Sequence, residues 1–356
     1  MEVVFYGKRW DRDRSGHIRL VHLDTVNSAN DYAFEHTAGG SGSDTRFLLE
    51  STKNCIAVIA DNQTGGHGRL GREWVSHPGG SLTASFAAAI PQKAVTKGYS
   101  NWLTVLAGVA AADSLEDLFA SCSGASQPGD SASALPGGSD RRNNSGAAIP
   151  VSASLKLKWP NDIYMNGRKL GGILIRLGAD SLDGGPGRDT SREGTGAAGR
   201  GEPMVLAVIG IGINCAVPAE KFNGFDAISL SSVMDVPAAG PLFTAFRDGL
   251  AESIAVRLSQ MLSDFKSSPS ETCRYLRNRA EKLDFLRAKP VTVSLPSGET
   301  FTGTAKGISA DASLAVGLED GSLRRITVGD VSAGVPQPAQ HTIHTITVNS
   351  TVNKGR

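Results

Sequence analysis

Two arginines among four glycines form the stretch of this 356-residue chain that is best suited to chemistry. Arg69 and Arg72 lie in the sequence NQTGGHGRLGREW at residues 62–74, which follows an apolar run at residues 55–60. Glycine lets backbone N–H groups approach a ligand closely because no Cβ intervenes, and guanidinium groups bind anionic oxygens in pairs. A strand that opens into such a loop predicts an anion site, with a plain flexible hairpin as the alternative.

The same loop matches the GxGxxG pattern of dinucleotide-binding proteins at residues 66–71. That pattern requires a helix that opens on the last glycine and an acidic residue about 20 residues later. Residues 74–80 instead have the composition of a turn, and the window near Ile90 contains no acidic residue. The sequence also lacks GxxxxGK[ST], so neither a Rossmann site nor a P-loop is expected.

A second group of polar residues follows a predicted strand at residues 155–163. Asn161 and Asp162 occupy a Pro-Asn-Asp turn, and an Asn-Gly hairpin signal at residues 166–167 folds Lys169 back toward Asp162. One lysine, two arginines and one carboxylate suit the junction of a carboxylate with a nucleotide phosphate, where cations stabilise the charge of an in-line transition state. Asp162 is then a candidate Mg²⁺ ligand or a candidate base.

Each of these residues also has a purely structural interpretation. Asp162 is a residue type that commonly forms turns, and Trp159 beside a proline is typical of packing. Lys156 and Lys158 are expected to lie on a solvated face of their strand, because lysine is rarely buried. Taken singly, each residue favours the structural interpretation.

Hydrophobic periodicity indicates the elements that must position these groups. The expected strands cover residues 18–23, 55–60, 81–86, 155–163, 163–165, 168–176 and 205–213, and the expected helices begin at Tyr32, span 101–119 and 241–265, and follow Ser268. Ser28 and Asn30 precede the first helix, where they are typical capping residues or, alternatively, face a ligand.

Changes in composition divide the chain into parts. The expected order is an N-terminal extension at 1–17, an α+β domain at 18–284, a small β-barrel at 285–334 and a disordered tail at 335–356. Stretches rich in Gly, Ser, Ala and Pro predict low-complexity insertions within the larger domain at residues 121–154 and 178–201.

The totals argue against several classes of protein. A net charge of +1 disfavours binding to nucleic acid or to an anionic membrane. The four cysteines are far apart, which argues against a metal site and a disulfide framework and favours a reducing compartment. Because no apolar run reaches membrane-spanning length and the first residues lack a signal peptide, we expect a cytoplasmic protein.

Four motifs in this order, GGHGRLGREW, KWPND, RKLGGIL and GIGIN, resemble those of biotin protein ligases, also called holocarboxylase synthetases. The likeness covers residues 18–332 apart from the insertions, and residues 27–30 resemble the family's DSTN segment. It implies a mixed β-sheet ligase domain with helices packed on it, followed by an SH3-like β-barrel. It also implies that biotin and ATP form biotinyl-5′-AMP with Mg²⁺, and that biotin passes to a lysine of a biotin carboxyl carrier domain.

The resemblance further implies roles for individual residues. The catalytic group would comprise Lys169, Arg69, Arg72 and Asp162. The biotin site would comprise Ser28, Ala29, Asn30, Gln63, His67, Gly68, Arg69, Lys169, Gly171 and Gly172. The ATP site would comprise Arg69, Arg72, Trp74, Asn161, Lys169 and Asn214. In this scheme Lys169 bridges the biotin carboxylate and the α-phosphate, and Asp162 activates the carrier lysine and is a candidate Mg²⁺ ligand.

The chain departs from the family pattern in a few places. His67 stands where the family often has arginine, and Ala29 replaces the threonine of DSTN. A competing register would place Thr25 and Asn27 at the biotin site instead of Ser28 and Asn30. The family's helix-turn-helix domain does not precede the ligase region, so we expect a ligase without repressor activity.

The function inferred from the resemblance leaves two alternatives open: a lipoate- or octanoate-transferring relative, and a non-enzymatic binding module. The acceptor carboxylase, the oligomeric state and the role of the insertions are not determined by the sequence. The four glycines also predict that the loop is ordered with biotinyl-AMP and loose without it.

Overall fold

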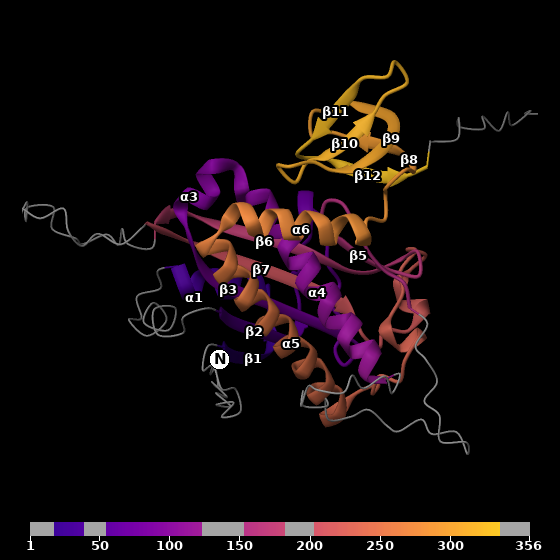
Figure 1. Cartoon of the computed structure of the whole chain (residues 1–356). Coiled ribbons are helices and arrows are strands. Elements are labelled where there is room, and N and C mark those ends of the chain that lie inside the picture. The colour runs from indigo at the N-terminus through magenta and orange to yellow at the C-terminus, as the bar shows by residue number, and fades with distance from the viewer. Residues whose placement is uncertain (1–17, 39–54, 123–152, 182–202, 335–356) are drawn as a thin grey trace, which may run out of the picture.

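The computed structural model describes residues 18–38, 55–122, 153–181 and 203–334. Within these ranges a large mixed sheet carries three long helices on one side, and a smaller antiparallel sheet formed by the C-terminal strands stands at one end (Figure 1). This α+β architecture agrees with the fold expected from the sequence. Among the described residues, no helix is both long enough and apolar enough to cross a membrane.

Seven strands form the large sheet. Their spatial order is β1 (Ile18–Val26), β2 (Cys55–Gln63), β3 (Ser81–Pro91), β7 (Met204–Asn214), β6 (Arg168–Ser181), β5 (Asp162–Met165) and β4 (Leu155–Lys158). The pair β1–β2 is parallel because α1 (Ala29–Ala38) crosses over between the two strands, and the other pairs are antiparallel. The sheet is therefore mixed.

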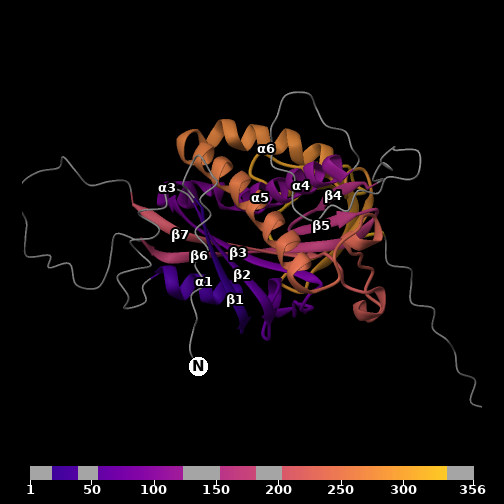
Figure 2. The same cartoon turned by 90° about the horizontal axis from the view of Figure 1, so that it is seen from below.

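One face of this sheet is buried by α4 (Ser100–Cys122), α5 (Gly240–Ser267) and α6 (Pro269–Leu283), as Figure 2 shows. Alternating strand residues such as Ile209, Ile211 and Ile213 of β7 join the main core on that side. The period of two places Gly210 and Gly212 on the opposite face. Of the described helices, the shorter α1 packs on that second face, and the glycine-rich loop lies over another part of it.

The remaining helical segments are short. They are η1 (Arg69–Gly71), α3 (Gln92–Ala94), η2 (Val95–Tyr99), η3 (Ala219–Phe222) and η4 (Leu230–Ser232). The η1 turn forms the tip of the glycine-rich loop, and η3 and η4 lie in the segment that follows β7. These segments connect the main elements and set the positions of the loops between them.

The C-terminal domain is a five-stranded antiparallel sheet with its own core. Its order is β11 (Leu323–Ile326), β10 (Leu314–Gly317), β9 (Thr300–Ile308), β8 (Pro290–Ser294) and β12 (Asp330–Ala333). The sequence predicts a small β-barrel, and the pairings of the described residues leave β11 and β12 as the two edges of the sheet. The short strands and tight turns are confirmed, and the structure does not show the ring closure.

Two tryptophans connect the C-terminal domain to the large one. The indole Nε1 of Trp102 donates to the carbonyl of Ala310 at 3.1 Å, and that of Trp159 donates to the carbonyl of Ala312 at 3.1 Å. Trp159 also belongs to the hydrophobic core of the C-terminal domain. The packing role expected for Trp159 is confirmed, Trp102 is likewise buried in the core of the large domain, and these contacts fix the smaller domain beside the turn that follows β4.

The insertion boundaries shift in the structure. α4 continues to Cys122, just past the expected boundary at residue 121, and β6 continues to Ser181, so residue 178 is not the start of the second insertion. Most of both insertions, the N-terminal extension and the C-terminal tail lie outside the described residues. A strand that ends in Gly-Ala-Asp-Ser has too little apolar character to be separated from a loop by periodicity alone.

Candidate active site

The glycine-rich loop folds back on itself as a hydrogen-bonded hairpin. The N–H of Gly68 donates to the carbonyl of Arg72 at 2.7 Å, and the N–H of Trp74 donates to the carbonyl of Gly66 at 2.9 Å. At the tip Leu70 has a φ of 56°, which is rare for a residue with a branched side chain, and Gly71 has a φ of 72°. The turn therefore projects Arg69 and Arg72 from a defined backbone.

Two glycines at the start of the loop allow close packing against the beginning of α1. A Cβ on Gly65 would lie 2.1 Å from Oδ1 of Asn27, and one on Gly66 would lie 2.1 Å from Nε2 of Gln63. Gln63 in turn accepts a hydrogen bond from the backbone N–H of Ala29 at 2.8 Å through its Oε1. Gln63 and Ala29, both predicted to contact biotin, are thus hydrogen-bonded to each other beside the loop.

The indole of Trp74 lies across the glycines of β6 and β7. A Cβ on Gly212 would come within 2.3 Å of the ring, and one on Gly172 would be 3.8 Å from the ring and 3.9 Å from both Asp162 Oδ1 and Lys169 Cε. The Trp74 Nε1 atom is buried and has no hydrogen-bond partner among the described residues. Trp74, Asp162 and Lys169 therefore gather over the open face of the sheet.

Asp162 is paired with two lysines, one at each oxygen. Its Oδ1 lies 2.7 Å from Nζ of Lys169, and its Oδ2 lies 3.7 Å from Nζ of Lys158. The side chain of Lys169 is 39% exposed, whereas that of Lys158 is 16% exposed. The contact with Lys169 agrees with the hairpin signal. The expectation that Lys158 lies on a solvated face is wrong, because β4 and β5 pair it directly with Asp162.

Arg69 lies between the Pro-Asn-Asp turn and the C-terminal domain. Its guanidinium donates to Oδ1 of Asn161 at 3.4 Å and to the carbonyl of Gly329 at 3.3 Å. Burial lowers the pKa of Arg69, and the carboxylates of Asp330 and Asp162 partly oppose that shift. Lys169 contacts Asp162, the residue after Asn161, so the two cations predicted to act together reach adjacent residues of one turn.

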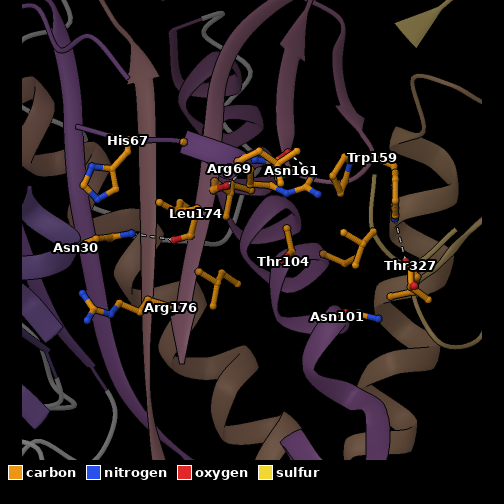
Figure 3. A pocket seen from close by; sticks show the side chains of 18 of the residues that line it. Asn30, His67, Arg69, Asn101, Thr104, Trp159, Asn161, Leu174, Arg176 and Thr327 are labelled. Carbon is orange, nitrogen blue, oxygen red and sulfur yellow. Dashed lines mark hydrogen bonds between the residues drawn. The ribbon is translucent and has the colours of Figure 1, made fainter. Parts of the chain in front are cut away.

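A cavity of about 650 Å³ opens beside these groups, a size typical of small-molecule sites. Arg69, Asn161 and Leu174 lie between its two ends, with Asn30, His67 and Arg176 at one end and Asn101, Trp159 and Thr327 at the other (Figure 3). The lining residues therefore come from α1, the glycine-rich loop, β6, α4, the turn after β4 and the C-terminal domain.

Hydrogen bonds and ion pairs hold the α1 end of the cavity. Asn30 accepts a hydrogen bond from Ser85 Oγ at 2.6 Å and donates to the carbonyl of Leu174 at 3.1 Å. Asp31 lies 3.2 Å from Nε2 of His67 and 2.7 Å from Nη1 of Arg176. His67, which stands where the family often has arginine, thus faces a carboxylate.

Three of the predicted site residues support neighbouring elements of the fold. Ser28 caps α1, because its Oγ accepts a hydrogen bond from the N–H of Asp31 at 3.2 Å. Asn214 is 7% exposed and donates to the carbonyl of Ile228 at 3.3 Å. A Cβ on Gly171 would lie 2.3 Å from the carbonyl oxygen of Gly212, so this glycine allows the close approach of β6 and β7.

The predicted residues divide into three groups by position. Asn30, His67, Gly68, Arg69 and Asn161 line the cavity. Trp74, Asp162, Lys169 and Gly172 gather over the adjoining strands, and Arg72 pairs with Asp330 of the C-terminal domain. Ser28, Ala29, Gln63, Gly171 and Asn214 support these elements through the contacts given above. The cavity contains Asn30 and neither Thr25 nor Asn27, which favours the Ser28–Asn30 register.

Several site residues were not predicted from the sequence. Leu174 and Arg176 follow Gly172 at intervals of two, so strand periodicity could have placed them on the same face. Lys158 is part of the KWPND motif, but its neighbours gave no sign that it faces Asp162. Asp330 belongs to the other domain, and no local pattern links it to the loop.

The residues around Asp162 do not fit a magnesium ion held by this carboxylate. Both of its oxygens face lysine ammonium groups. Among the described residues, no group of three or more His, Cys, Asp or Glu side chains is arranged to hold a metal ion. A metal ligand role for Asp162 would require at least one of these lysines to move away, and it stays a prediction.

Comparison with known proteins gives matches in both domains. The model of the biotin/lipoate A/B protein ligase family matches residues 42–181, and that of the biotin protein ligase C-terminal domain matches residues 289–334. A biotin--[acetyl-CoA-carboxylase] ligase from Mycobacterium tuberculosis is 25% identical over 276 residues, 78% of each chain. The bifunctional ligase/repressor BirA from Escherichia coli is 26% identical over 294 residues, 82% of this chain and 71% of that protein.

Solved structures support the fold. The biotin protein ligase from Aquifex aeolicus in complex with biotin and ATP has a TM-score of 0.55 and 20% sequence identity, covering 88% of this chain and 99% of that one. The structure of its R40G mutant in complex with biotin has a TM-score of 0.54 and 19% identity, with 88% and 98% covered. The arrangement of the large sheet and the C-terminal domain is thus shared with known proteins.

Proposed function

We propose that the chain is an ATP-dependent biotin–protein ligase. It belongs to the biotin/lipoate A/B protein ligase family and has the C-terminal domain of biotin protein ligases. The enzyme activates biotin to biotinyl-5′-AMP and transfers it to a lysine of a biotin carboxyl carrier domain. One observation carries this proposal: Arg69 and Lys169, from distant segments, contact the adjacent residues Asn161 and Asp162 of one turn, at the edge of the cavity.

In the first half-reaction an oxygen of the biotin carboxylate attacks the α-phosphorus of ATP, and pyrophosphate leaves. Negative charge gathers on the phosphoryl oxygens, so preorganised cations lower the barrier. Lys169 and Arg69 supply these cations, with Arg72 nearby at the C-terminal domain. A magnesium ion bound to the ATP phosphates would supply further charge neutralisation, while Lys169 and Arg69 are the cations that the chain itself provides.

In the second half-reaction the carrier lysine attacks the acyl carbon of biotinyl-AMP. A lysine with an ordinary pKa near 10.4 is protonated at neutral pH and must first lose a proton. Asp162 accepts that proton, because it is the carboxylate that the structure places beside Lys169. The new C–N bond forms as the C–O bond to the phosphate breaks, and AMP leaves with its electron pair.

The named relatives indicate the acceptor, and the cysteines indicate the compartment. The Mycobacterium tuberculosis relative is named for acetyl-CoA carboxylase, so we assign transfer to the carrier domain of such a carboxylase. The four cysteines are free in the structure, three of them buried, which agrees with a reducing compartment such as the cytoplasm. A lipoate ligase remains the alternative within the family, but the matched C-terminal domain and the named relatives favour biotin.

The test incubates the full chain with ATP, Mg²⁺, radiolabelled biotin and a biotin carboxyl carrier domain. We expect label on the carrier and a biotinyl-AMP intermediate detectable by mass spectrometry. A parallel reaction with lipoate or octanoate identifies the acid that is adenylated. Adenylation of lipoate in preference to biotin, or the absence of any adenylate, would overturn the proposal.

A further inference from the structure

Lys158 lies beside Asp162, on the neighbouring strand. Lys158 is the last residue of β4 and Asp162 is the first of β5, and the two are cross-strand partners. Side chains at such positions lie on the same face of the sheet. The Lys158 side chain is only 16% exposed, so its ammonium group needs a counterion, and Asp162 provides it at 3.7 Å.

The two lysines on Asp162 differ in accessibility. Lys169 forms the shorter contact and is the more exposed of the pair. Burial lowers the pKa of Lys158, and Lys169 lowers it further while Asp162 raises it. The charge on Lys158 therefore depends on Asp162, whereas Lys169 can turn toward a bound anion at a smaller desolvation cost.

The ammonium group of Lys169 cannot keep its contact with Asp162 while it also directs its N–H groups at the acyl phosphate. When Lys169 directs its N–H groups at the reacting oxygens, Asp162 loses its nearest cation. A carboxylate that is only 15% exposed then needs another partner to hold its orientation. Lys158 would then be the cation that stays with Asp162.

We propose that Lys158 is a positioning residue that stays paired with Asp162 and holds its orientation while Lys169 donates to the acyl phosphate. This inference rests on the proposed ligase function and assigns Lys158 to the transfer half-reaction. Asp162 then takes one proton from the carrier ammonium group. The second ammonium proton is lost to the departing AMP phosphate or to water as the amide forms.

The alternative role for Lys158 is direct contact with the phosphate. In that case Lys158 would contribute to adenylation as Lys169 does. The two roles are separable, because the half-reactions can be measured independently and because a nucleophile that is neutral at pH 7 does not need the base. Hydroxylamine is such a nucleophile and attacks acyl adenylates directly.

The test compares Lys158→Met, Lys158→Arg and the wild-type chain. Lys156→Met is the matched control, since Lys156 is on the same strand and donates to the carbonyl of Lys282 at 2.9 Å, away from Asp162. The first measurement is the single-turnover rate of biotinyl-AMP formation. The second is the rate of biotin transfer from preformed adenylate to a carrier domain or to hydroxylamine.

We expect Lys158→Met to slow transfer to the carrier by about 10- to 100-fold, a part of the 10²–10⁴ that a general base contributes. Adenylation and transfer to hydroxylamine should stay within about threefold of wild type, and Lys158→Arg should restore transfer to the carrier. Equal losses in both half-reactions, or no loss in Lys158→Met, would overturn the inference. Failure of the wild-type chain to form any adenylate would instead overturn the proposed function.

Discussion

At the scale of residues, the charge balance around Asp162 matches the reaction. Lys158 and Lys169 pair with this carboxylate, Arg69 contacts the adjacent Asn161, and Arg72 pairs with Asp330. Among the described residues, these four cations and two carboxylates leave an excess of two positive charges. A carboxylate and a phosphate that meet at this point would supply the missing negative charge.

Lys169 is the residue whose loss should be most damaging to adenylation. Lys169→Met keeps the length and the apolar stem of the side chain but removes the ammonium group. We expect the single-turnover rate of biotinyl-AMP formation to fall by about 10²–10³-fold, because one preorganised donor to a developing anion is lost. A matched control is Arg168→Met, which removes the exposed partner of Asp226 on the same hairpin. A rate for Lys169→Met within a few-fold of this control would contradict the assignment.

The sequence identifies some of these residues because their local patterns carry the information. The Asn-Gly signal places Lys169 opposite Asp162, and the hairpin of the structure agrees. Lys158 was misassigned for a physical reason. It shares a strand face with Lys156, and the pattern of alternation cannot distinguish the lysine that meets Asp162 from the one that meets the end of α6.

At the scale of elements, the glycines of β6 and β7 make room for side chains of the protein itself. A Cβ on Gly210 would lie 2.4 Å from Oδ1 of Asn30, and one on Gly212 would lie 2.3 Å from the ring of Trp74. The motifs GG and GIG indicate close backbone approach, but they do not identify the approaching group. The contacts with Asn30 and Trp74 come from segments more than 100 residues away, which a local pattern cannot contain.

Gly212→Ala tests the packing of Trp74 on the sheet. The added methyl group overlaps the indole, so the ring must leave its position, and overpacking of this kind costs about 1–3 kcal/mol. We expect a lower midpoint of denaturant unfolding and easier acrylamide quenching of Trp74, measured against a Trp74→Phe background. Gly178→Ala is the control, because its Cβ meets neighbours only at 3.6 Å. Equal quenching in the two variants would show that Trp74 does not lie on Gly212.

Asp284, at the junction between α6 and the C-terminal domain, gives a pH-dependent prediction. Burial raises its pKa, although Oδ1 accepts the N–H groups of Leu286 and Arg287, and its buried Oδ2 has no partner among the described residues. A raised carboxyl pKa contributes stability at low pH that is lost as the pH rises through the folded-state value. The stability of Asp284→Asn relative to wild type should therefore be higher at pH 7 than at pH 4.

The measurement for Asp284→Asn is the difference in Tm from wild type at pH 7 and at pH 4. Asp320→Asn is a control of opposite sign, because hydrogen bonds from Ser322 lower the pKa of Asp320. A lowered carboxyl pKa contributes stability at neutral pH that is lost on acidification, so this variant should compare worse with wild type at pH 7. The same sign for both variants would refute the electrostatic account.

At the scale of the whole molecule, the C-terminal domain completes the site. The start of β12 contacts both arginines of the loop. Arg72 pairs with Asp330, and Arg69 donates to the carbonyl of Gly329. Thr327 and Val328 also line the cavity. The domain therefore holds the glycine-rich loop over the sheet.

Asp330→Asn should loosen this loop. The amide keeps the size of the side chain but loses the charge that pairs with Arg72, so trypsin should cleave after Arg69 or Arg72 several-fold faster. Glu299→Gln is the matched control, because it breaks a different arginine pair, with Arg324, in the same domain. Cleavage at equal rates in both variants would contradict the role of Asp330.

The same proteolysis tests the prediction that the loop is looser without ligand. Biotin with ATP should protect the wild-type loop, because the anion then binds the arginines in place of the C-terminal domain. Protection in wild type together with faster cleavage of Asp330→Asn is the expected pattern. Equal cleavage with and without ligand would count against an ordering role for the adenylate.

The order of the two domains could be predicted from the sequence, but their contact could not. Periodicity and turn signals separate residues 18–284 from the short strands that follow, and the structure contains both parts in that order. The docking depends on two indole N–H groups that bind backbone carbonyls, and on one acidic residue that meets Arg72. Every residue has a backbone carbonyl, so the sequence does not indicate which carbonyls accept these hydrogen bonds.

The central claim is that Arg69 and Lys169 act on one acyl-phosphate junction, and a double-mutant cycle on biotinyl-AMP formation tests it most directly. The cycle compares Arg69→Met, Lys169→Met and the double variant by single-turnover rates. Residues that act as a unit are non-additive, so the double variant should lose little more than the worse single variant. Strictly additive losses, or a wild-type rate in either single variant, would show that the two cations do not share the reacting centre.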